Sequence, residues 1–283
     1  MTSPLVFLNG QFLPLADAKI SVLDRGFLFG DGIYEVVPVY GKKPLRLSEH
    51  LRRLEHSLHA LRMASPYSDS EWADIFNRLI DGPQDQQIYL QITRGAQTKR
   101  DHAIPQSIEP TVFAMCTPIA PIPLGGVSAV TRDDIRWDRC NIKAITLLAN
   151  VLLKQEALDI GASEAILVRD GFALEGASSN IFIVSGKQVI TPPKGPTILP
   201  GITRDLVLEL AKAQGYETVE RSIPADELPQ ADEIWLTSST REILAVTELD
   251  GKRIGAGQPG PIWQDVLSAY QSYKQTLRSH SNT

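Results

Sequence analysis

A lysine and two hydroxyl-rich segments are the residues of this sequence whose types and spacing indicate chemistry. Lys143 comes just before a helix expected over 146–160, at the end where the helix macrodipole disfavours a cation. A positive helix end destabilises the charged form of a nearby ammonium, and a neutral amine can form a Schiff base or act as a general base. Most lysines are solvated surface residues, so position alone does not assign this one a role.

Two other segments have the composition of phosphate-binding sites. Gly201-Ile-Thr-Arg204 opens an expected helix, so the free amides of Ile202 and Thr203 and the Thr203 hydroxyl can bind an anion. Thr237-Ser-Ser-Thr240, which includes Ser239, follows an expected strand and offers four hydroxyl groups in a row. Each alone is equally a capped helix start or a polar turn. Together with a candidate Schiff-base lysine, they predict a phosphorylated aldehyde cofactor, pyridoxal 5'-phosphate.

Other ionisable residues are further candidates for binding the cofactor or a substrate. Glu175 lies in a short segment between two expected strands, where its carboxylate can face a protonated ring nitrogen. Arg53 and His50 lie one turn apart beside a leucine stripe, and an arginine fork suits a phosphate. Arg100 and His102 lie in a polar loop and can bind a substrate carboxylate. For each residue, the alternative is a solvated surface position.

The elements that must position these residues are divided by a proline- and glycine-rich break. Residues 119–126 form the expected linker, between a smaller α+β domain over 1–118 and a larger α/β domain over 127–283. Both parts mix strands with helices, so the predicted fold class is α+β, with a ligand-binding cleft between the two domains.

The expected elements follow from hydrophobic periodicity and turn signals. In the first domain we expect strands on either side of Asn9-Gly10 and over 33–39, 87–93 and 111–116, and helices over 47–61, capped by Ser48, and 69–80. In the second we expect an extended run over 126–137, strands over 164–169, 180–184 and 233–236, and helices over 146–160, from the 199–205 segment to about 215, and from about 261.

Composition excludes several classes of protein. The chain has 283 residues, 43% of them hydrophobic, and a net charge of -5 from 28 basic and 33 acidic residues. It can bury a large core, and its charge gives no general attraction to nucleic acid or an anionic membrane. No segment approaches the roughly 20 apolar residues of a membrane helix, and the amino terminus lacks the pattern of a secretory signal. With only Cys116 and Cys140, the sequence predicts a cytoplasmic protein without a disulfide framework or a metal site.

Seven segments, in order, resemble those of a known family. They are Asp24-Arg-Gly-Phe-Leu-Phe-Gly-Asp-Gly-Ile-Tyr-Glu35, Glu49-His-Leu-Arg-Arg-Leu54, Ile142-Lys143, Leu153-Lys-Gln-Glu-Ala157, Glu175-Gly-Ala-Ser-Ser-Asn-Ile-Phe182, Gly201-Ile-Thr-Arg204 and Thr237-Ser-Ser-Thr240. The sequence is similar over nearly its whole length to the fold-type IV pyridoxal-phosphate enzymes, or class IV aminotransferases. These include D-amino-acid aminotransferases, branched-chain aminotransferases and aminodeoxychorismate lyases. The resemblance implies a two-domain α+β fold with the cofactor in the interdomain cleft.

The resemblance also implies a role for each matching residue. Lys143 would hold pyridoxal phosphate as a Schiff base, and Glu175 would pair with its pyridine nitrogen. The phosphate would be bound by Arg53, Ile202, Thr203 and Ser239. Arg136, at the end of the strand expected before Lys143, would lie near the ring hydroxyl, and Ser178 would pack beside the ring.

Within the family, the sequence is most similar to the D-amino-acid aminotransferases. There, a tyrosine matching Tyr34 and a loop matching Arg100 and His102 bind the substrate α-carboxylate, and the loop comes from the partner subunit of a homodimer. The predicted reaction exchanges an amino group between D-alanine and 2-oxoglutarate, giving pyruvate and D-glutamate. Pro38 in place of a lysine, Ala177 in place of a serine and a longer loop before Arg100 depart from that pattern and bear on the substrate range.

Three alternatives stay open at this point. A branched-chain L-aminotransferase would share the cofactor residues, and replacing Arg100 should be mild there but cripple a D-amino-acid enzyme. An aminodeoxychorismate lyase would share them too, and it would release pyruvate without an amino acceptor. A non-catalytic binding protein on the same fold would tolerate the loss of Lys143.

Overall fold

The structure, a computed structural model, describes residues 3–279 and divides into two compact units. Of the described residues, the first unit comprises 3–119, 142–146 and 277–279, and the second comprises Ala120–Asn141 and Leu147–Thr276. The residues expected as a linker, 119–126, contain no helix or strand. They lie between the last strand of the first unit, β6 (Thr111–Pro118), and the first strand of the second, β7 (Val127–Asp133).

The first unit is built on an antiparallel sheet of order β2-β1-β6-β5-β3-β4. Its other strands are β1 (Leu5–Leu8), β2 (Gln11–Pro14), β3 (Gly32–Tyr40), β4 (Lys43–Pro44) and β5 (Gln86–Thr93). Its helical elements are the 3₁₀ turn η1 (Leu15–Asp17), α1 (Arg25–Phe29), α2 (Leu47–Ala60) and α3 (Asp69–Leu79). The Asn9-Gly10 turn between β1 and β2 is confirmed, with φ positive at both residues, as a tight hairpin turn requires.

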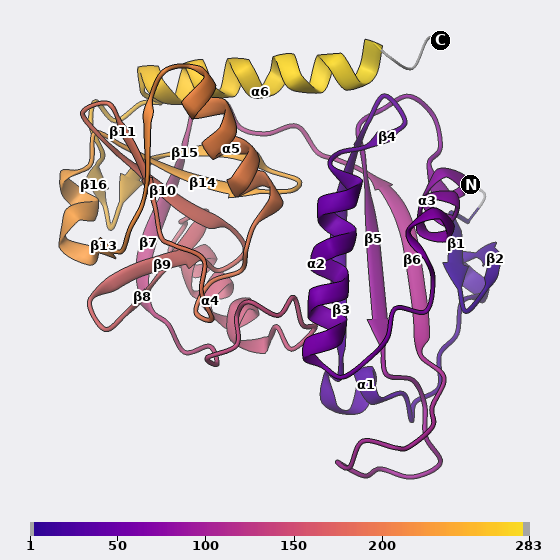
Figure 1. Ribbon diagram of the computed structural model, residues 1–283. Helices are drawn as coiled ribbons and strands as arrows, with labels where there is room; N and C mark the ends of the chain where they lie inside the picture. The colour runs from indigo at the N-terminus through magenta and orange to yellow at the C-terminus, as the bar shows by residue number, and fades with distance from the viewer. Residues whose placement is uncertain (1–2, 280–283) are drawn as a thin grey trace. The chain divides into compact units, whose positions relative to one another are not determined.

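Helix α2 lies along β3 and buries the leucine stripe that its sequence predicts (Figure 1). Leu51, Leu54 and Leu58 pack with β3 side chains in the core of the first unit. Ser48 is not the cap expected from the sequence, because the helix begins at Leu47 with Arg46 as its N-cap. The Ser48 hydroxyl instead donates to the Glu49 carboxylate, 2.8 Å away.

The segment with Lys143 packs with the first unit, whereas the sequence-based division placed it in the second domain. The reason is a pair of backbone hydrogen bonds to β3: the Tyr34 amide donates to the Lys143 carbonyl at 3.0 Å and the Ile145 amide to the Gly32 carbonyl at 3.1 Å. Ile142 and Ala144 are buried in the same core as α2 and β3. The local backbone of Lys143 is therefore fixed by the first unit.

The second unit is a 10-stranded mixed sheet that closes on itself. Its strands after β7 are β8 (Glu164–Arg169), β9 (Phe172–Gly176), β10 (Asn180–Ser185), β11 (Gln188–Thr191), β12 (Glu217–Glu220), β13 (Ile223–Pro224), β14 (Glu233–Ser238), β15 (Glu242–Leu249) and β16 (Lys252–Arg253). Strand β9 pairs with β8 and, at Glu175↔Asn180, with β10. This pairing completes a ring in the order β10-β14-β15-β7-β8-β9.

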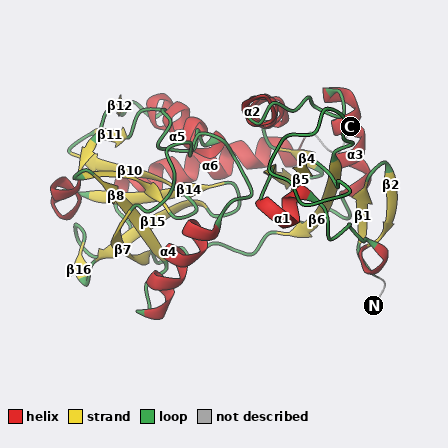
Figure 2. Ribbon diagram, turned by 90° about the horizontal axis from the view of Figure 1, so that it is seen from below, coloured by secondary structure: helices red, strands yellow, loops and turns green. Residues whose placement is uncertain are grey.

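Apolar side chains fill the ring, and helices cover its outside. Ile166, Ile181, Leu236 and Leu244 belong to the cluster inside the ring. Helix α4 (Leu148–Asp159) packs Leu153 and Ala157 against outward-facing side chains of β7 and β8, and α5 (Ile202–Ala213) packs on β14 (Figure 2). The remaining elements are the 3₁₀ helix η2 (Ala225–Gln230) and α6 (Pro261–Ser279).

Two expectations for the second unit are corrected. The helix expected over 146–160 begins at Leu148, so Lys143 lies five residues before it rather than immediately before it. The segment 170–179, expected to connect two strands, contains β9, so Glu175 lies on a strand.

Two other findings bear on the class of protein. Cys116 and Cys140 are free thiols, and burial raises the pKa of each to about 11. Within residues 3–279, no helix has the length and apolarity needed to cross a bilayer.

Candidate active site

The Lys143 amine lies against the ring of Tyr34. The Ala144 amide donates to the Ile142 carbonyl at 2.8 Å, so Lys143 is the central residue of a tight turn whose two flanking side chains are buried in the core. Its Nζ is 4.0 Å from the centroid of the Tyr34 ring, and both side chains are half-buried. The Lys143 amide also donates to the Ser57 hydroxyl of α2 at 3.2 Å. The structure thus brings together the predicted Schiff-base lysine and the predicted substrate-binding tyrosine.

Arg53 is held in one orientation by Glu35. Its Nε and Nη2 donate to the two carboxylate oxygens of Glu35 at 2.7 and 2.8 Å, and His50 Nδ1 lies 2.9 Å from Glu35 Oε2. All three side chains are buried. Burial alone would raise the pKa of Glu35, but Arg53 and His50 hold it well below its ordinary range. Burial lowers the pKa of His50, so its ring is neutral at pH 7. The charges among these three residues are then those of the ion pair between Arg53 and Glu35.

Arg100 and His102 lie in the exposed loop between β5 and β6. The guanidinium carbon of Arg100 is 5.0 Å from the centroid of the Phe29 ring, and the His102 ring centroid is also 5.0 Å from it. The structure therefore brings these two predicted carboxylate-binding residues together on one aromatic ring of α1.

Glu175 is a buried carboxylate on the outer face of the ring of strands, where it pairs with Leu167, a residue packed against α4. Its Oε2 accepts hydrogen bonds from Asn180 Nδ2 and the Leu199 amide, both at 3.1 Å, and Arg136 Nη1 donates to Oε1. A register shift in the pairing of β8 with β9 leaves Leu174 as an extra residue. Such a bulge re-aims the following side chain, and here it turns Glu175 away from the apolar interior that contains Ala173.

The pKa of Glu175 is raised to about 6. Burial is the largest cause, and the charge and hydrogen bond of Arg136 oppose it without cancelling it. A carboxyl group with this pKa is mostly ionised at pH 7 but is poised to exchange a proton near neutrality.

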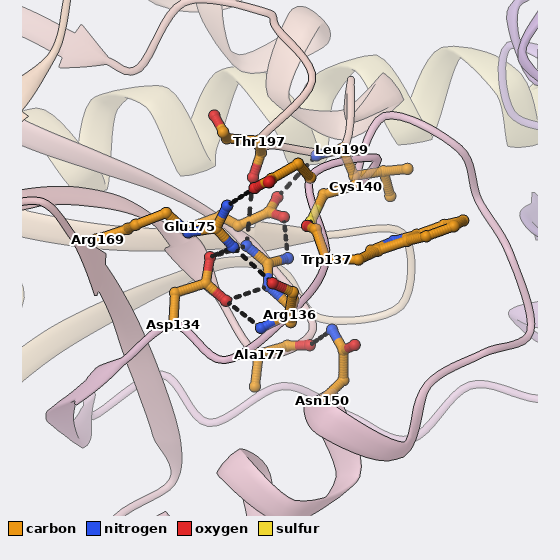
Figure 3. Close-up of polar contacts among 11 residues, drawn as sticks. Asp134, Arg136, Trp137, Cys140, Asn150, Arg169, Glu175, Ala177, Thr197 and Leu199 are labelled. Carbon is orange, nitrogen blue, oxygen red and sulfur yellow. Dashed lines mark hydrogen bonds and ion pairs between the residues drawn. The ribbon is translucent and has the colours of Figure 1, made fainter.

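Arg136 is fixed by an acidic neighbour that sequence reasoning missed. It lies beyond the end of β7 at Asp133, not at the end of a strand as expected. Its Nε and Nη2 donate to the two oxygens of Asp134 at 2.9 and 3.0 Å, and Nη2 also donates to the Thr197 carbonyl at 3.3 Å (Figure 3). Asp134, Arg136 and Glu175 thus form a buried charge network in the second unit.

Helix α5 begins without a side-chain cap. Its N-cap is Gly201, so the amides of Ile202 and Thr203 begin the helix with no capping side chain. A Cβ on Gly201 would lie 1.9 Å from Asn180 Oδ1, so only glycine fits beside that amide. Asn180 therefore links the Glu175 carboxylate to the start of α5, a role that sequence reasoning did not assign to it.

Two further predicted residues lie in the second unit, Ser178 between β9 and β10 and Ser239 between β14 and β15. The Ser178 hydroxyl is 3.0 Å from both Glu164 Oε2 and Arg241 Nη2. Ser239 lies half-buried in the turn between β14 and β15. Just before it, the buried Thr237 Oγ1 has no hydrogen-bond partner within residues 3–279. Thr237 pairs with Asn180 in the sheet, so this hydroxyl lies on the same face as Glu175.

Comparison with known proteins identifies the family. Residues 32–249 match the family described as amino-transferase class IV. The chain belongs to the class IV aminotransferases. A D-alanine aminotransferase from Bacillus licheniformis is 40% identical over 94% of this chain and 96% of its own, and one from Staphylococcus aureus (strain N315) is 37% identical over 98% and 99%. The crystal structure of a branched-chain aminotransferase from Thermoproteus uzoniensis with norvaline has a TM-score of 0.86 at 28% identity, covering 98% of this chain and 95% of that one.

The residues present fit the cofactor of this family. Class IV aminotransferases depend on pyridoxal 5'-phosphate, a phosphorylated pyridine aldehyde. The uncapped start of α5 and the unpartnered Thr237 hydroxyl suit a phosphate, the buried Glu175 suits a ring nitrogen, and the Lys143 amine suits an aldehyde. Fold class, enzyme class and cofactor predicted from the sequence are therefore confirmed at the level of the family.

Proposed function

We propose that this class IV aminotransferase exchanges an amino group between D-alanine, or a related D-amino acid, and 2-oxoglutarate. Curated D-alanine aminotransferases match the chain over nearly its full length. The observation in the structure that supports the proposal best is the Lys143 amine, 4.0 Å from the ring of Tyr34. Tyr34 is the residue expected to contact the substrate carboxylate, so the amine that handles the Cα proton lies beside the group that orients Cα.

We also assign the cofactor-binding residues by proposal. Lys143 would bind the aldehyde, and Glu175 the ring nitrogen. Arg53, Ile202, Thr203 and Ser239 would bind the phosphate, with Glu35 fixing the Arg53 fork. Arg136 would lie near the ring hydroxyl and Ser178 beside the ring. When bound, pyridoxal phosphate supplies a carbonyl for the amino group and an electron sink for the Cα electrons.

The chain's own residues would then divide the work of proton transfer. Lys143 Nζ removes the proton from the substrate Cα, as a general base whose proton transfer typically contributes 10² to 10⁴ in rate. Tyr34 and the loop with Arg100 and His102, which the resemblance brings from the partner of a homodimer, hold the substrate carboxylate so that Cα faces this amine. Glu175 keeps a negative charge beside the ring nitrogen, and burial strengthens that interaction because the local dielectric is low.

A half-reaction test distinguishes this activity from its alternatives. The purified protein with its cofactor is mixed with D-alanine, and separately with L-leucine, in the absence of any keto acid. We expect D-alanine alone to change the visible absorption of the cofactor and to release one pyruvate per site. A change with L-leucine only would replace the D-amino-acid activity by branched-chain L-amino-acid activity, which the branched-chain enzyme of similar fold makes the second candidate. Pyruvate release from aminodeoxychorismate without an acceptor would indicate the lyase.

We propose that the protein is a homodimer that contacts its partner through α4. This helix exposes a stripe of apolar side chains, Leu148, Val151, Leu152 and Leu158, which recurs with helical spacing. Exposed apolar stripes of this kind mark protein interfaces. Light scattering should give twice the mass of one chain, and the double substitution Val151→Lys with Leu152→Glu should give a folded monomer. A wild-type mass of one chain at micromolar concentration would contradict this assembly.

The free thiols of Cys116 and Cys140 fit a reducing compartment, and we propose a cytoplasmic location.

A further inference from the structure

The loop between β5 and β6 carries two of the residues proposed to bind substrate but has no regular structure of its own. Residues 97–110 contain no helix or strand, and the loop projects beyond the ends of both strands (Figure 1). A loop of this length usually has several poses unless other residues hold it. The useful pose of Arg100 and His102 therefore depends on contacts that fix their backbone.

One buried arginine of α1 supplies those contacts. Arg25 Nη1 donates to the carbonyls of Asp101 at 2.6 Å and Ala103 at 3.2 Å, and Nη2 donates to the carbonyl of His102 at 3.2 Å. The Arg25 side chain is 4% exposed, so these bonds are shielded from water. One rigid guanidinium thus binds the carbonyls of three successive residues, of which His102 is the middle one.

Arg25 is itself anchored on the side away from the loop. Its Nε donates to Asp31 Oδ2 at 2.7 Å, and Arg94 donates to both oxygens of the same carboxylate at 2.8 and 3.0 Å. Arg94 Nη2 also donates to the Leu61 carbonyl at 2.7 Å. The fork cannot rotate without breaking the bond to Asp31, so it presents a fixed set of donors to the loop.

The base of the loop is tied to the same helix. Asp24, the N-cap of α1, accepts hydrogen bonds from the hydroxyls of Thr93 at 2.9 Å and Thr111 at 2.6 Å. These threonines end β5 and begin β6, where the loop leaves the sheet and returns to it. A Cβ on Gly26, the second residue of α1, would lie 2.2 Å from Thr93 Cγ2, so the helix packs directly on this base.

The ring of Phe29 contacts the side chains of Arg100 and His102. It lies 5.0 Å from the Arg100 guanidinium carbon, from the Arg25 guanidinium carbon and from the His102 ring centroid. Arg25 therefore fixes the backbone of the loop while Phe29 fixes the two side chains that project from it.

We propose that Arg25 is a positioning residue for substrate binding, which holds the 101–103 backbone so that Arg100 and His102 meet the substrate carboxylate in one pose. The inference rests on the proposed function, because it takes from there the role of Arg100 and His102. Arg25 itself touches neither substrate nor cofactor in this assignment. Its effect should appear in the affinity for the amino acid and in the mobility of the loop.

The test compares Arg25→Lys with three other variants. Lysine can keep the ion pair with Asp31, but one ammonium cannot span three carbonyls. We expect KM for D-alanine to rise roughly tenfold or more with a much smaller change in kcat, and amide hydrogen exchange over 97–110 to accelerate in the protein without substrate. The exchange of β3 and the absorption of the bound cofactor should stay unchanged. Arg52→Lys, an exposed arginine of α2, is the matched control and should change neither quantity.

Two further variants keep the outcome decisive. Arg100→Ala should raise KM without accelerating loop exchange, because it removes a donor and leaves the backbone bonds of Arg25 in place. Phe29→Leu should raise KM through the side chains alone, and it tests the support if Arg25→Lys does not fold. Unchanged loop exchange and KM in folded Arg25→Lys would overturn the positioning role. If Arg25→Lys accelerates loop exchange but neither Arg25→Lys nor Arg100→Ala raises KM, the substrate carboxylate does not bind to this loop. That result would overturn the role of Arg25 in substrate binding as well.

Discussion

Replacing Lys143 by Ala should abolish transamination while leaving the protein folded. Turnover should fall by about 10⁴-fold or more, because the variant lacks both the amine that binds the aldehyde and the base that removes the Cα proton. Folding should be preserved because Ile142 and Ala144, not Lys143, fill the core of the first unit. The backbone hydrogen bonds of this segment to β3 do not involve the side chain.

The measurement combines a chemical label with kinetics. Borohydride reduction of the protein with its cofactor, followed by peptide mass mapping, should place a pyridoxyl group on Lys143 in the wild type and on no residue of Lys143→Ala. Single-turnover release of pyruvate from D-alanine should be lost in the same variant. Lys187→Ala, in the exposed turn between β10 and β11, is the matched control and should keep both signals. A pyridoxyl group on another lysine, or normal turnover in Lys143→Ala, would remove Lys143 from the centre of the site.

Local patterns predicted most of the secondary structure in the first unit. The Asn9-Gly10 hairpin and the leucine stripe of α2 are signals carried by neighbouring residues, and the structure confirms both. Positions at helix ends were less predictable. The residue before α2, Arg46, adopts φ 48°, a left-handed conformation that an arginine does not signal, whereas the sequence pattern predicts Ser48 as the cap.

Strand β9 shows why the sequence could not predict the geometry around Glu175. In a regular strand, Ala173 and Glu175 would face the same side, since side chains alternate with period two. The bulge at Leu174 breaks that alternation, so Ala173 pairs with Val168 and Glu175 with Leu167, which face opposite sides. Hydrophobic periodicity therefore does not predict a strand at β9, although this strand positions the Glu175 carboxylate.

Glu35 and Arg25 were missed as orienting residues because their contacts are long-range, unlike those of Asp134 and Asn180. Glu35 precedes Arg53 by 18 positions, and Arg25 contacts carbonyls more than 70 positions away. No local spacing encodes such pairs. The only available signal was that Arg25, Glu35 and Asn180 lie inside segments that resemble the family.

Replacing Glu175 by Gln should lower turnover by about 10²-fold or more while leaving the Lys143 label intact. The amide has nearly the shape of the carboxylate, so the contacts with Asn180 and the Leu199 amide can persist in part. It cannot supply the negative charge that stabilises a protonated ring nitrogen. Glu248→Gln, on an exposed position of β15, is the matched control and should keep wild-type turnover. Wild-type turnover in Glu175→Gln would show that this carboxylate does not act on the ring.

The same substitution should change how stability depends on pH in the protein without cofactor. The pKa of Glu175 is about 6 in the folded chain against an ordinary value of 4.5, so the folded state binds more protons between these two pH values. The stabilisation is complete below pH 4.5 and is lost as pH rises through 6, a change of about 2 kcal/mol for this single group. Urea unfolding at pH 4.5, 5.5 and 7 should therefore show the wild type losing about 2 kcal/mol relative to Glu175→Gln across this range. Parallel pH profiles for the two proteins would mean that Arg136, rather than burial, controls the ionisation of Glu175.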